Sequence, residues 1–213
     1  MRTTIGVAMV LCLVMPAMGQ AWTEDFNDGG NFPWAIDDLL GNSAVTGWDY
    51  NYNIIDGTDP RGNFSSGDGG AAHVDTDVRP ESGSGPYNIA IVSPSFVVPA
   101  DATLDYVLNF QVVSVDAEFA HIEINDGSGW VSLMTYSNDT GGMPPSPYTA
   151  DLALGVAGSH DISAYAGSTA EVRFRYEGDG WDWWMQVDDI AVTPEPTAVA
   201  LIGLGALALL RRR

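Results

Sequence analysis

The chain has 213 residues and a strongly acidic composition, with 28 Asp and Glu residues against 8 Arg and no Lys. Nucleic-acid binding depends on Lys and Arg side chains that neutralise phosphates, so this composition excludes nucleic acid as a partner. The acidity either serves only to keep an extracellular protein soluble or also attracts divalent cations.

Residues 1–21 have the pattern of a secretory signal peptide. Arg2 precedes an apolar run, and small residues then lead up to Gly19 and Ala21, after either of which we expect cleavage. The apolar run is about 11 residues long, which suits a signal peptide and is short for a membrane span. The only cysteine, Cys12, lies in this run, so the exported protein is expected to have no disulfide.

Residues 22–193 have the pattern of one all-β domain. Short runs rich in β-branched and aromatic residues alternate with Gly, Pro, Asn and Asp, and none of the long stretches shows a helical apolar period. Asp126-Gly127 between two alternating runs suits a hairpin turn. We therefore predict an antiparallel β-sandwich of the jelly-roll type. The expected strands are 22–26, 71–75, 88–93, 103–113, 119–125, 130–136, 158–163, 170–177 and 183–192. The segment 27–70 is expected to form ordered loops.

Two pairs of adjacent acidic residues are candidates for a metal site. Glu24 and Asp25 lie in the first expected strand, and Asp188 and Asp189 lie in the last. Calcium takes six to eight oxygen ligands, and carboxylates supply them. These four residues either contribute to a structural calcium site or simply lie at the surface and cap turns.

Aromatic residues alternate at two places, Trp48 to Tyr50 and Trp181 to Trp183. On a strand, residues two apart share one face. Such a pair near a loop can stack on sugar rings, whereas large aromatic side chains also dominate protein cores. The sequence leaves open a carbohydrate platform at Trp48, Tyr50, Trp181 and Trp183 or ordinary core and edge packing.

The sequence contains no recognisable catalytic motif. His73, His121 and His160 are isolated, and no Cys pair accompanies them as a zinc site requires. Neither a Gly-x-Ser-x-Gly motif nor a phosphate-binding loop is present. We therefore expect a protein that is not an enzyme, and we keep a glycan-active hydrolase as the least favoured alternative.

Residues 194–213 form a separate tail that ends in a cluster of arginines. Its distinguishing residues are Pro194, Glu195, Pro196, Arg211, Arg212 and Arg213. As a helix, the apolar stretch 197–210 would be about 21 Å long at ~1.5 Å per residue, against a hydrocarbon core of about 30 Å. We predict a short transmembrane helix whose arginines stay in the cytoplasm, with the body on the other side.

This tail resembles the PEP-CTERM sorting signal of Gram-negative bacteria that make exopolysaccharide. The resemblance implies an inner-membrane-anchored intermediate, processing by an exosortase-type enzyme, and delivery to the cell surface or extracellular matrix.

The body also contains a succession of short motifs along its whole length. They are Glu24-Asp25-Phe26, Ile91-Val92-Ser93-Pro94, Asp161-Ile162-Ser163-Ala164-Tyr165, Val172-Arg173-Phe174-Arg175-Tyr176 and Asp188-Asp189-Ile190. This order is similar to the choice-of-anchor and cleaved-adhesin jelly rolls, which are relatives of the MAM domain. The resemblance implies that the first and last strands lie close together and hold a structural calcium there. It is this implication that selects Glu24, Asp25, Asp188 and Asp189 among the many acids of the chain.

The predicted function is therefore that of an exported, non-catalytic surface or matrix protein. We expect a binding or adhesion module that is associated with extracellular polysaccharide. The alternative is a structural matrix protein without a discrete ligand.

Overall fold

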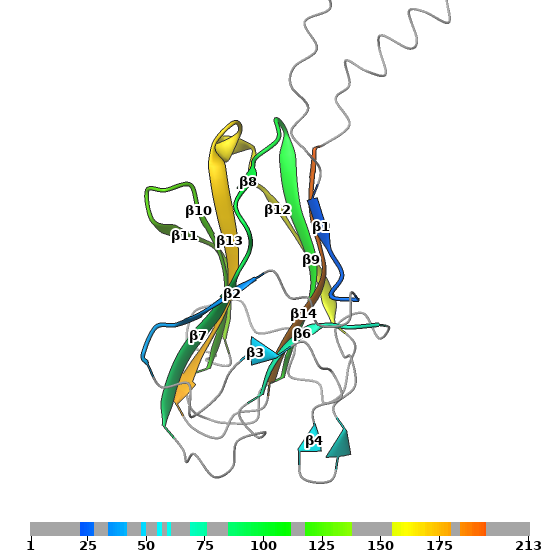
Figure 1. Cartoon of the computed structure of the whole chain (residues 1–213), viewed down its shortest axis with the longest axis vertical. Helices are drawn as coiled ribbons and strands as arrows, with labels where there is room; N and C mark the ends of the chain where they lie inside the picture. The colour runs from blue at the N-terminus through cyan, green and yellow to red at the C-terminus, as the bar shows by residue number, and fades with distance from the viewer. Residues whose placement is uncertain are drawn as a thin grey trace, which may run out of the picture.

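The structure is a computed structural model, and it describes ten stretches of the chain. These are 22–27, 34–41, 48–49, 55–56, 59–60, 69–75, 85–111, 118–137, 155–179 and 184–194, of which 48–49, 55–56 and 59–60 are described by their backbone alone. Two antiparallel sheets lie face to face over these residues, as Figure 1 shows. The predicted antiparallel β-sandwich is confirmed.

Sheet A has the strand order β12-β9-β14-β6-β3, and β1 also pairs with β14. β14 is the central strand, because β9 pairs along one of its sides while β6 and then β1 pair along the other. The bounds are β1 Trp22–Glu24, β3 Trp48–Asp49, β6 Ala72–Asp75, β9 Ala102–Gln111, β12 Val156–Asp161 and β14 Trp184–Pro194.

Sheet B has the strand order β11-β10-β13-β7-β2, and β8 also pairs with β13. The bounds are β2 Ala35–Asp38, β7 Pro86–Val92, β8 Phe96–Val97, β10 Phe119–Asn125, β11 Trp130–Ser137 and β13 Thr169–Asp179. A further pair joins β4 (Ile55–Asp56) to β5 (Asp59–Pro60), and a single 3-10 turn covers Ser163–Tyr165.

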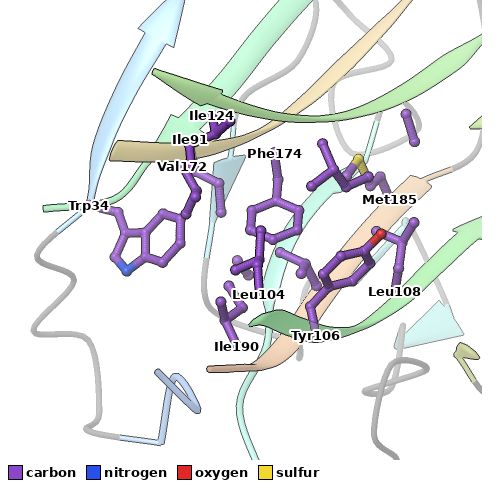
Figure 2. Close-up of a cluster of buried hydrophobic side chains, with 14 of the residues drawn as sticks. Trp34, Ile91, Leu104, Tyr106, Leu108, Ile124, Val172, Phe174, Met185 and Ile190 are labelled. Atoms are coloured by element: carbon purple, nitrogen blue, oxygen red, sulfur yellow. The ribbon is translucent and has the colours of Figure 1, made fainter. Parts of the chain in front are cut away.

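The core fills the space between the two sheets. Alternate residues of each long strand point inward, and Figure 2 shows Phe174 of β13 among Leu104, Tyr106 and Leu108 of β9. All four of these side chains are buried. Truncating one such aromatic side chain to Ala typically costs about 3–5 kcal/mol.

β14 contains a β-bulge that keeps its apolar residues in the core. Asp188 pairs with Val107, whereas Ala191 pairs with Asp105, so β14 has one extra residue here. Asp189 lies in the bulge with a φ of 49°, in the left-handed region. Met185 and Val187 before the bulge and Ile190 and Val192 after it all belong to the hydrophobic core. Without the extra residue, strict alternation would turn the second pair outward.

A tyrosine hydroxyl joins the two sheets at their open edge, where β11 and β12 are the edge strands. The Tyr106 hydroxyl lies 2.8 Å from His160 Nε2 and 3.5 Å from the Tyr136 hydroxyl of the other sheet. Gly158 makes room for this ring, because a Cβ there would lie 2.3 Å from Tyr106 Cζ. Burial, partly offset by the charge of Asp105, lowers the pKa of His160.

The nine expected strands correspond to β1, β6, β7 and β9 to β14, with ends that shift by up to two residues. The expectation of loops across 27–70 was wrong in part, because β2 to β5 lie there. These strands have only two to four residues each, and a strand of this length is too short for an alternating pattern to be recognised.

Within the described residues, no helix is long and apolar enough to cross a membrane. The predicted signal peptide and the predicted apolar tail lie outside the described residues.

Candidate functional site

The aromatic residues predicted as a carbohydrate platform lie largely outside the described residues. Trp48 is in β3, where its backbone pairs with Val74, while Tyr50, Trp181 and Trp183 are not described. Their neighbour Trp184 is fully buried, and its Nε1 donates to Asn109 Oδ1 at 2.9 Å. The platform at these four positions stays a prediction.

The predicted calcium residues lie on two neighbouring strands. Glu24 of β1 pairs with Ile190, next to the bulge of β14 that contains Asp188 and Asp189. The Glu24 carboxylate accepts from the Phe26 amide at 2.9 Å and from Trp34 Nε1 at 3.3 Å.

The aspartates at this place make local contacts. Asp25 accepts from the Asn27 amide at 3.1 Å, and the buried Asp188 accepts from the Asp189 amide at 2.8 Å. In the part of the chain that the structure describes, His, Cys, Asp and Glu side chains form no group of three or more suited to a metal ion. The calcium site stays a prediction.

A charged network on the outer face of sheet B is the most developed polar constellation in the described residues. Glu123 of β10 pairs directly with Arg173 of β13, and Arg175 is two residues further along the same face. Glu123 Oε2 accepts from Arg173 Nε at 2.6 Å and from Arg175 Nε at 3.0 Å. Arg175 Nη1 also donates to Asn88 Oδ1 at 3.1 Å and to the Glu177 carboxylate.

Glu123 is held in its ionised form. Burial alone would raise the pKa of Glu123, but hydrogen bonds from Arg175 and Arg173 and their charges outweigh it, so its pKa lies below the ordinary value. A carboxyl with a lowered pKa does not store a proton for general acid catalysis at neutral pH. The contacts instead hold both guanidinium groups in place.

An indole ring lies beside this network. The guanidinium carbon of Arg173 is 4.2 Å from the centroid of the Trp130 ring, which is a cation–π distance. Arg173 is only 6% exposed, whereas Trp130 is half-buried. The face therefore combines a partly accessible aromatic ring with rigid hydrogen-bonding groups.

His121 extends the same face toward β11. Its Nδ1 lies 2.9 Å from Thr135 Oγ1, its Nε2 lies 3.2 Å from Glu177 Oε2, and its ring stacks on Phe119 at a centroid distance of 5.7 Å. Burial and then the charge of Arg175 lower the pKa of His121, against the opposing charges of Glu123 and Glu177. The ring is therefore neutral at pH 7 and can donate or accept a hydrogen bond.

The outer face of sheet A is different, because a group of its polar side chains around β14 is buried. They are His73, Asp75, Asn109, Gln111, Gln186 and Asp188, each 3% exposed or less. His73 Nε2 lies 3.5 Å from Asp75 Oδ2, and neither ring nitrogen of His73 makes a hydrogen bond. Among the described residues, the sheet B face therefore offers more accessible polar groups than this group of sheet A residues.

We define the sheet B face by Asn88, His121, Glu123, Trp130, Arg173, Arg175 and Glu177. Sequence reasoning did not select these residues as a site. The alternation in 170–176 and the Trp that follows the Asp126-Gly127 turn were the available signals. Their meeting depends on the register of β10 against β11 and β13, which the sequence does not display.

The sorting tail begins inside the folded body. Pro194 is the last residue of β14 and pairs with Ala102 of β9, while Glu195, Pro196 and Arg211 to Arg213 lie outside the described residues. Residues 192–213 match the family that is described as "PEP-CTERM protein-sorting motif". The chain ends in a PEP-CTERM sorting motif. The resemblance seen in the tail is confirmed, and no curated protein matches the sequence of the chain.

The fold of the body is similar to adhesin and carbohydrate-binding domains of solved structure. The K1 cleaved adhesin domain of Lys-gingipain from Porphyromonas gingivalis W83 is 12% identical, with a TM-score of 0.56 over 83% of this chain and 99% of that one. CBM27-1 of Caldicellulosiruptor saccharolyticus, solved with mannohexaose, is 15% identical, with a TM-score of 0.50 over 83% and 98%. TmCBM61, solved with β-1,4-galactotriose, is 12% identical, with a TM-score of 0.50 over 80% and 94%. These similarities establish the jelly-roll fold.

Proposed function

We propose that the protein is an exported, non-catalytic binding module that binds polysaccharide through the sheet B face. The sorting motif supports export, and the fold is one that the carbohydrate-binding domains named above use to bind oligosaccharides. The single observation that carries the proposal is the half-buried indole of Trp130 beside hydrogen-bonding groups that are already held in place. Sugar recognition needs these two elements, an apolar ring surface and a few fixed polar groups.

The fixed polar groups lower the entropic cost of binding. Long Arg and Glu side chains lose considerable rotamer freedom when a ligand orders them. Here Arg173 and Arg175 are already ordered by Glu123 before a ligand arrives. Preorganisation of this kind increases affinity without adding contacts.

The charge of the face favours a neutral glycan. Arg173 and Arg175 are the arginines of the described residues, and carboxylates of Glu123 and Glu177 pair with them. The remainder of the chain is strongly acidic, which repels uronate or sulfated polymers. A neutral polysaccharide meets neither an unpaired charge nor this repulsion.

Localisation follows from the two ends of the chain. We propose that the signal peptide exports the protein, that the apolar tail holds an intermediate in the inner membrane, and that an exosortase-type enzyme then releases the tail. The mature module would reside at the surface or in the extracellular matrix of a Gram-negative cell. The sorting motif at 192–213 supports this order of events.

A structural calcium ion is a secondary proposal. Glu24, Asp188 and Asp189 come from adjacent paired strands, and the bulge exposes Asp189 beside the buried Asp188. A metal ion that binds only the folded state stabilises it by mass action.

Calorimetric titration of the processed protein with neutral and acidic polysaccharides tests the main proposal. Mannohexaose and β-1,4-galactotriose serve as neutral probes, and polygalacturonate serves as the acidic probe. We expect Trp130→Ala to weaken neutral-glycan binding at least about tenfold, which corresponds to ~1.4 kcal/mol. Val131→Ala is the matched control, because Val131 is the next residue of β11 and is 46% exposed. Unchanged binding by Trp130→Ala would contradict the assignment of the site.

A further inference from the structure

Both ends of the folded body lie at one pole of the sandwich. β1 begins at Trp22, which pairs with Val192, only two residues before β14 ends at Pro194. Figure 1 shows the start of β1 and the end of β14 side by side at the same end of the molecule. The segments that precede and follow the body in sequence therefore leave it from this pole.

The tail has almost no spacer between the sandwich and its apolar segment. Pro194 still pairs with Ala102, and the apolar stretch begins at Thr197. Three residue steps span at most about 11 Å of fully extended chain. The headgroup layer of a bilayer is about 5–7 Å thick on each side. When the apolar stretch is in a bilayer, the pole must therefore lie at the lipid surface.

Two turns form the surface at this pole, residues 94–101 and 162–170. They are joined by backbone hydrogen bonds from Val98 to Ser168 at 3.0 Å and from Gly167 to Val98 at 2.9 Å. Val97 is 53% exposed at this surface. Hydrogen bonds therefore join the two turns into one surface, on which Val97 is an exposed apolar side chain.

The pole carries little charge for so acidic a chain. Asp101 is the one ionisable acid or base within the two turns apart from the phenol of Tyr165. Two acids flank the second turn and are engaged locally, since Asp161 accepts from the Ser163 amide at 2.8 Å and Glu171 accepts from the Ser95 hydroxyl at 2.9 Å. Anionic lipid headgroups therefore repel this surface far less than they repel the rest of the chain.

We propose that this membrane-facing pole, residues 94–101 and 162–170, docks on the lipid surface while the chain still carries its sorting tail. The short connection holds the pole there, and Val97 and the half-buried Tyr165 suit the interface between headgroups and acyl chains. Strands of both sheets then run away from the membrane, so the sheet B face stays open to solvent on the exported side.

Site-directed spin labelling of the tail-bearing chain without its signal peptide, residues 22–213, tests the proposal. This chain contains no cysteine, and it is reconstituted into vesicles of phosphatidylethanolamine and phosphatidylglycerol. A nitroxide is placed at Val97→Cys or Ala166→Cys in the pole, and at Asp179→Cys as the control. Asp179 ends β13, which begins at Thr169, so the control lies about 33 Å along the strand.

The measured quantity is the ratio of nitroxide collisions with lipid-soluble oxygen to those with a water-soluble nickel chelate. We expect this ratio at both pole positions to be several-fold higher than at position 179, and to fall to the control value in a chain truncated after Pro194. Equal ratios at the pole and control positions, in a protein with an unchanged circular dichroism spectrum, would overturn the proposal. Two separate pole positions guard against one label that disturbs the fold.

Discussion

Replacement of Glu123 by Gln tests most clearly how much the sheet B network contributes to the stability of the fold. The Glu123 side chain is 9% exposed and accepts hydrogen bonds from two guanidinium groups, whereas Glu177 is 39% exposed and pairs with one. A hydrogen bond to a charged group contributes about 1.5–3 kcal/mol, and breaking a fully buried ion pair costs about 3–5 kcal/mol. Gln keeps one acceptor oxygen but leaves Arg173 and Arg175 without their shared counter-charge.

We therefore expect Glu123→Gln to lower the free energy of unfolding by about 2–3 kcal/mol, between the exposed and the fully buried limits. Glu177→Gln is the matched control, with an expected loss under about 1 kcal/mol because an exposed pair is screened by water. Urea denaturation of the processed protein gives both values. The melting temperature should fall by about 4–12 °C for Glu123→Gln, at ~2–4 °C per kcal/mol in a domain of this size.

A double-mutant cycle with Arg173→Met separates the pair from its surroundings. Glu123 and Arg173 share a hydrogen bond, so the effects of the two single variants should not be additive. Arg173 also contacts the Trp130 ring, and its Nη1 lies 3.9 Å from Asp37 Oδ2, so Arg173→Met alone removes more than the pair with Glu123. If Glu123→Gln destabilised the protein no more than Glu177→Gln, the network would not hold the face in place, and the preorganisation argument would fail.

Three further predictions concern pH, packing and metal. Stability should decline as the pH falls, first below about 6.5 because the folded-state pKa values of His121 and His160 are lowered, and then below about 4.5 because that of Glu123 is lowered. Urea denaturation at pH 7.5, 5.5 and 4 measures this, and His121→Gln should remove the part of the upper step that His121 contributes. A profile with higher stability at pH 5.5 than at 7.5 would contradict the sign. Gly158→Ala should destabilise the protein by about 1–3 kcal/mol, because its Cβ would overlap the Tyr106 ring; a neutral result in thermal melting would show that the ring moves freely. If calcium binds near Glu24 and Asp189, excess calcium should raise the melting temperature relative to excess chelator, and equal melting temperatures would count against the metal.

The sequence predicts the long strands well, for a local reason. The alternation of polar and apolar residues in β10 and β13 has a period of two, and a single strand displays it without its partners. The hairpin at Asp126-Gly127 is equally local, since Asn125 and Asp126 accept from the backbone amides of the turn. Short strands such as β2 and β8 depend on their neighbours in the sheet and have no such pattern of their own.

The site was harder to predict, because it depends on long-range register. Glu123 and Arg173 are 50 residues apart, and a slip of one residue between β10 and β13 would turn one of them into the core. The bulge at Asp188 and Asp189 is similarly invisible in the sequence, although it decides which of the two is buried. By contrast, the sorting motif is predictable from the sequence alone, since the order of its parts is itself the signal.

Chemical-shift mapping of the processed protein during titration with mannohexaose tests the central claim most directly. If the sheet B face binds neutral glycan, the Trp130 indole N–H resonance and the Nε–H resonances of Arg173 and Arg175 should shift together and saturate, while the buried Trp184 indole on sheet A stays in place. Saturable shifts centred on Trp184 and the outer face of sheet A, with none at Trp130, would contradict the account.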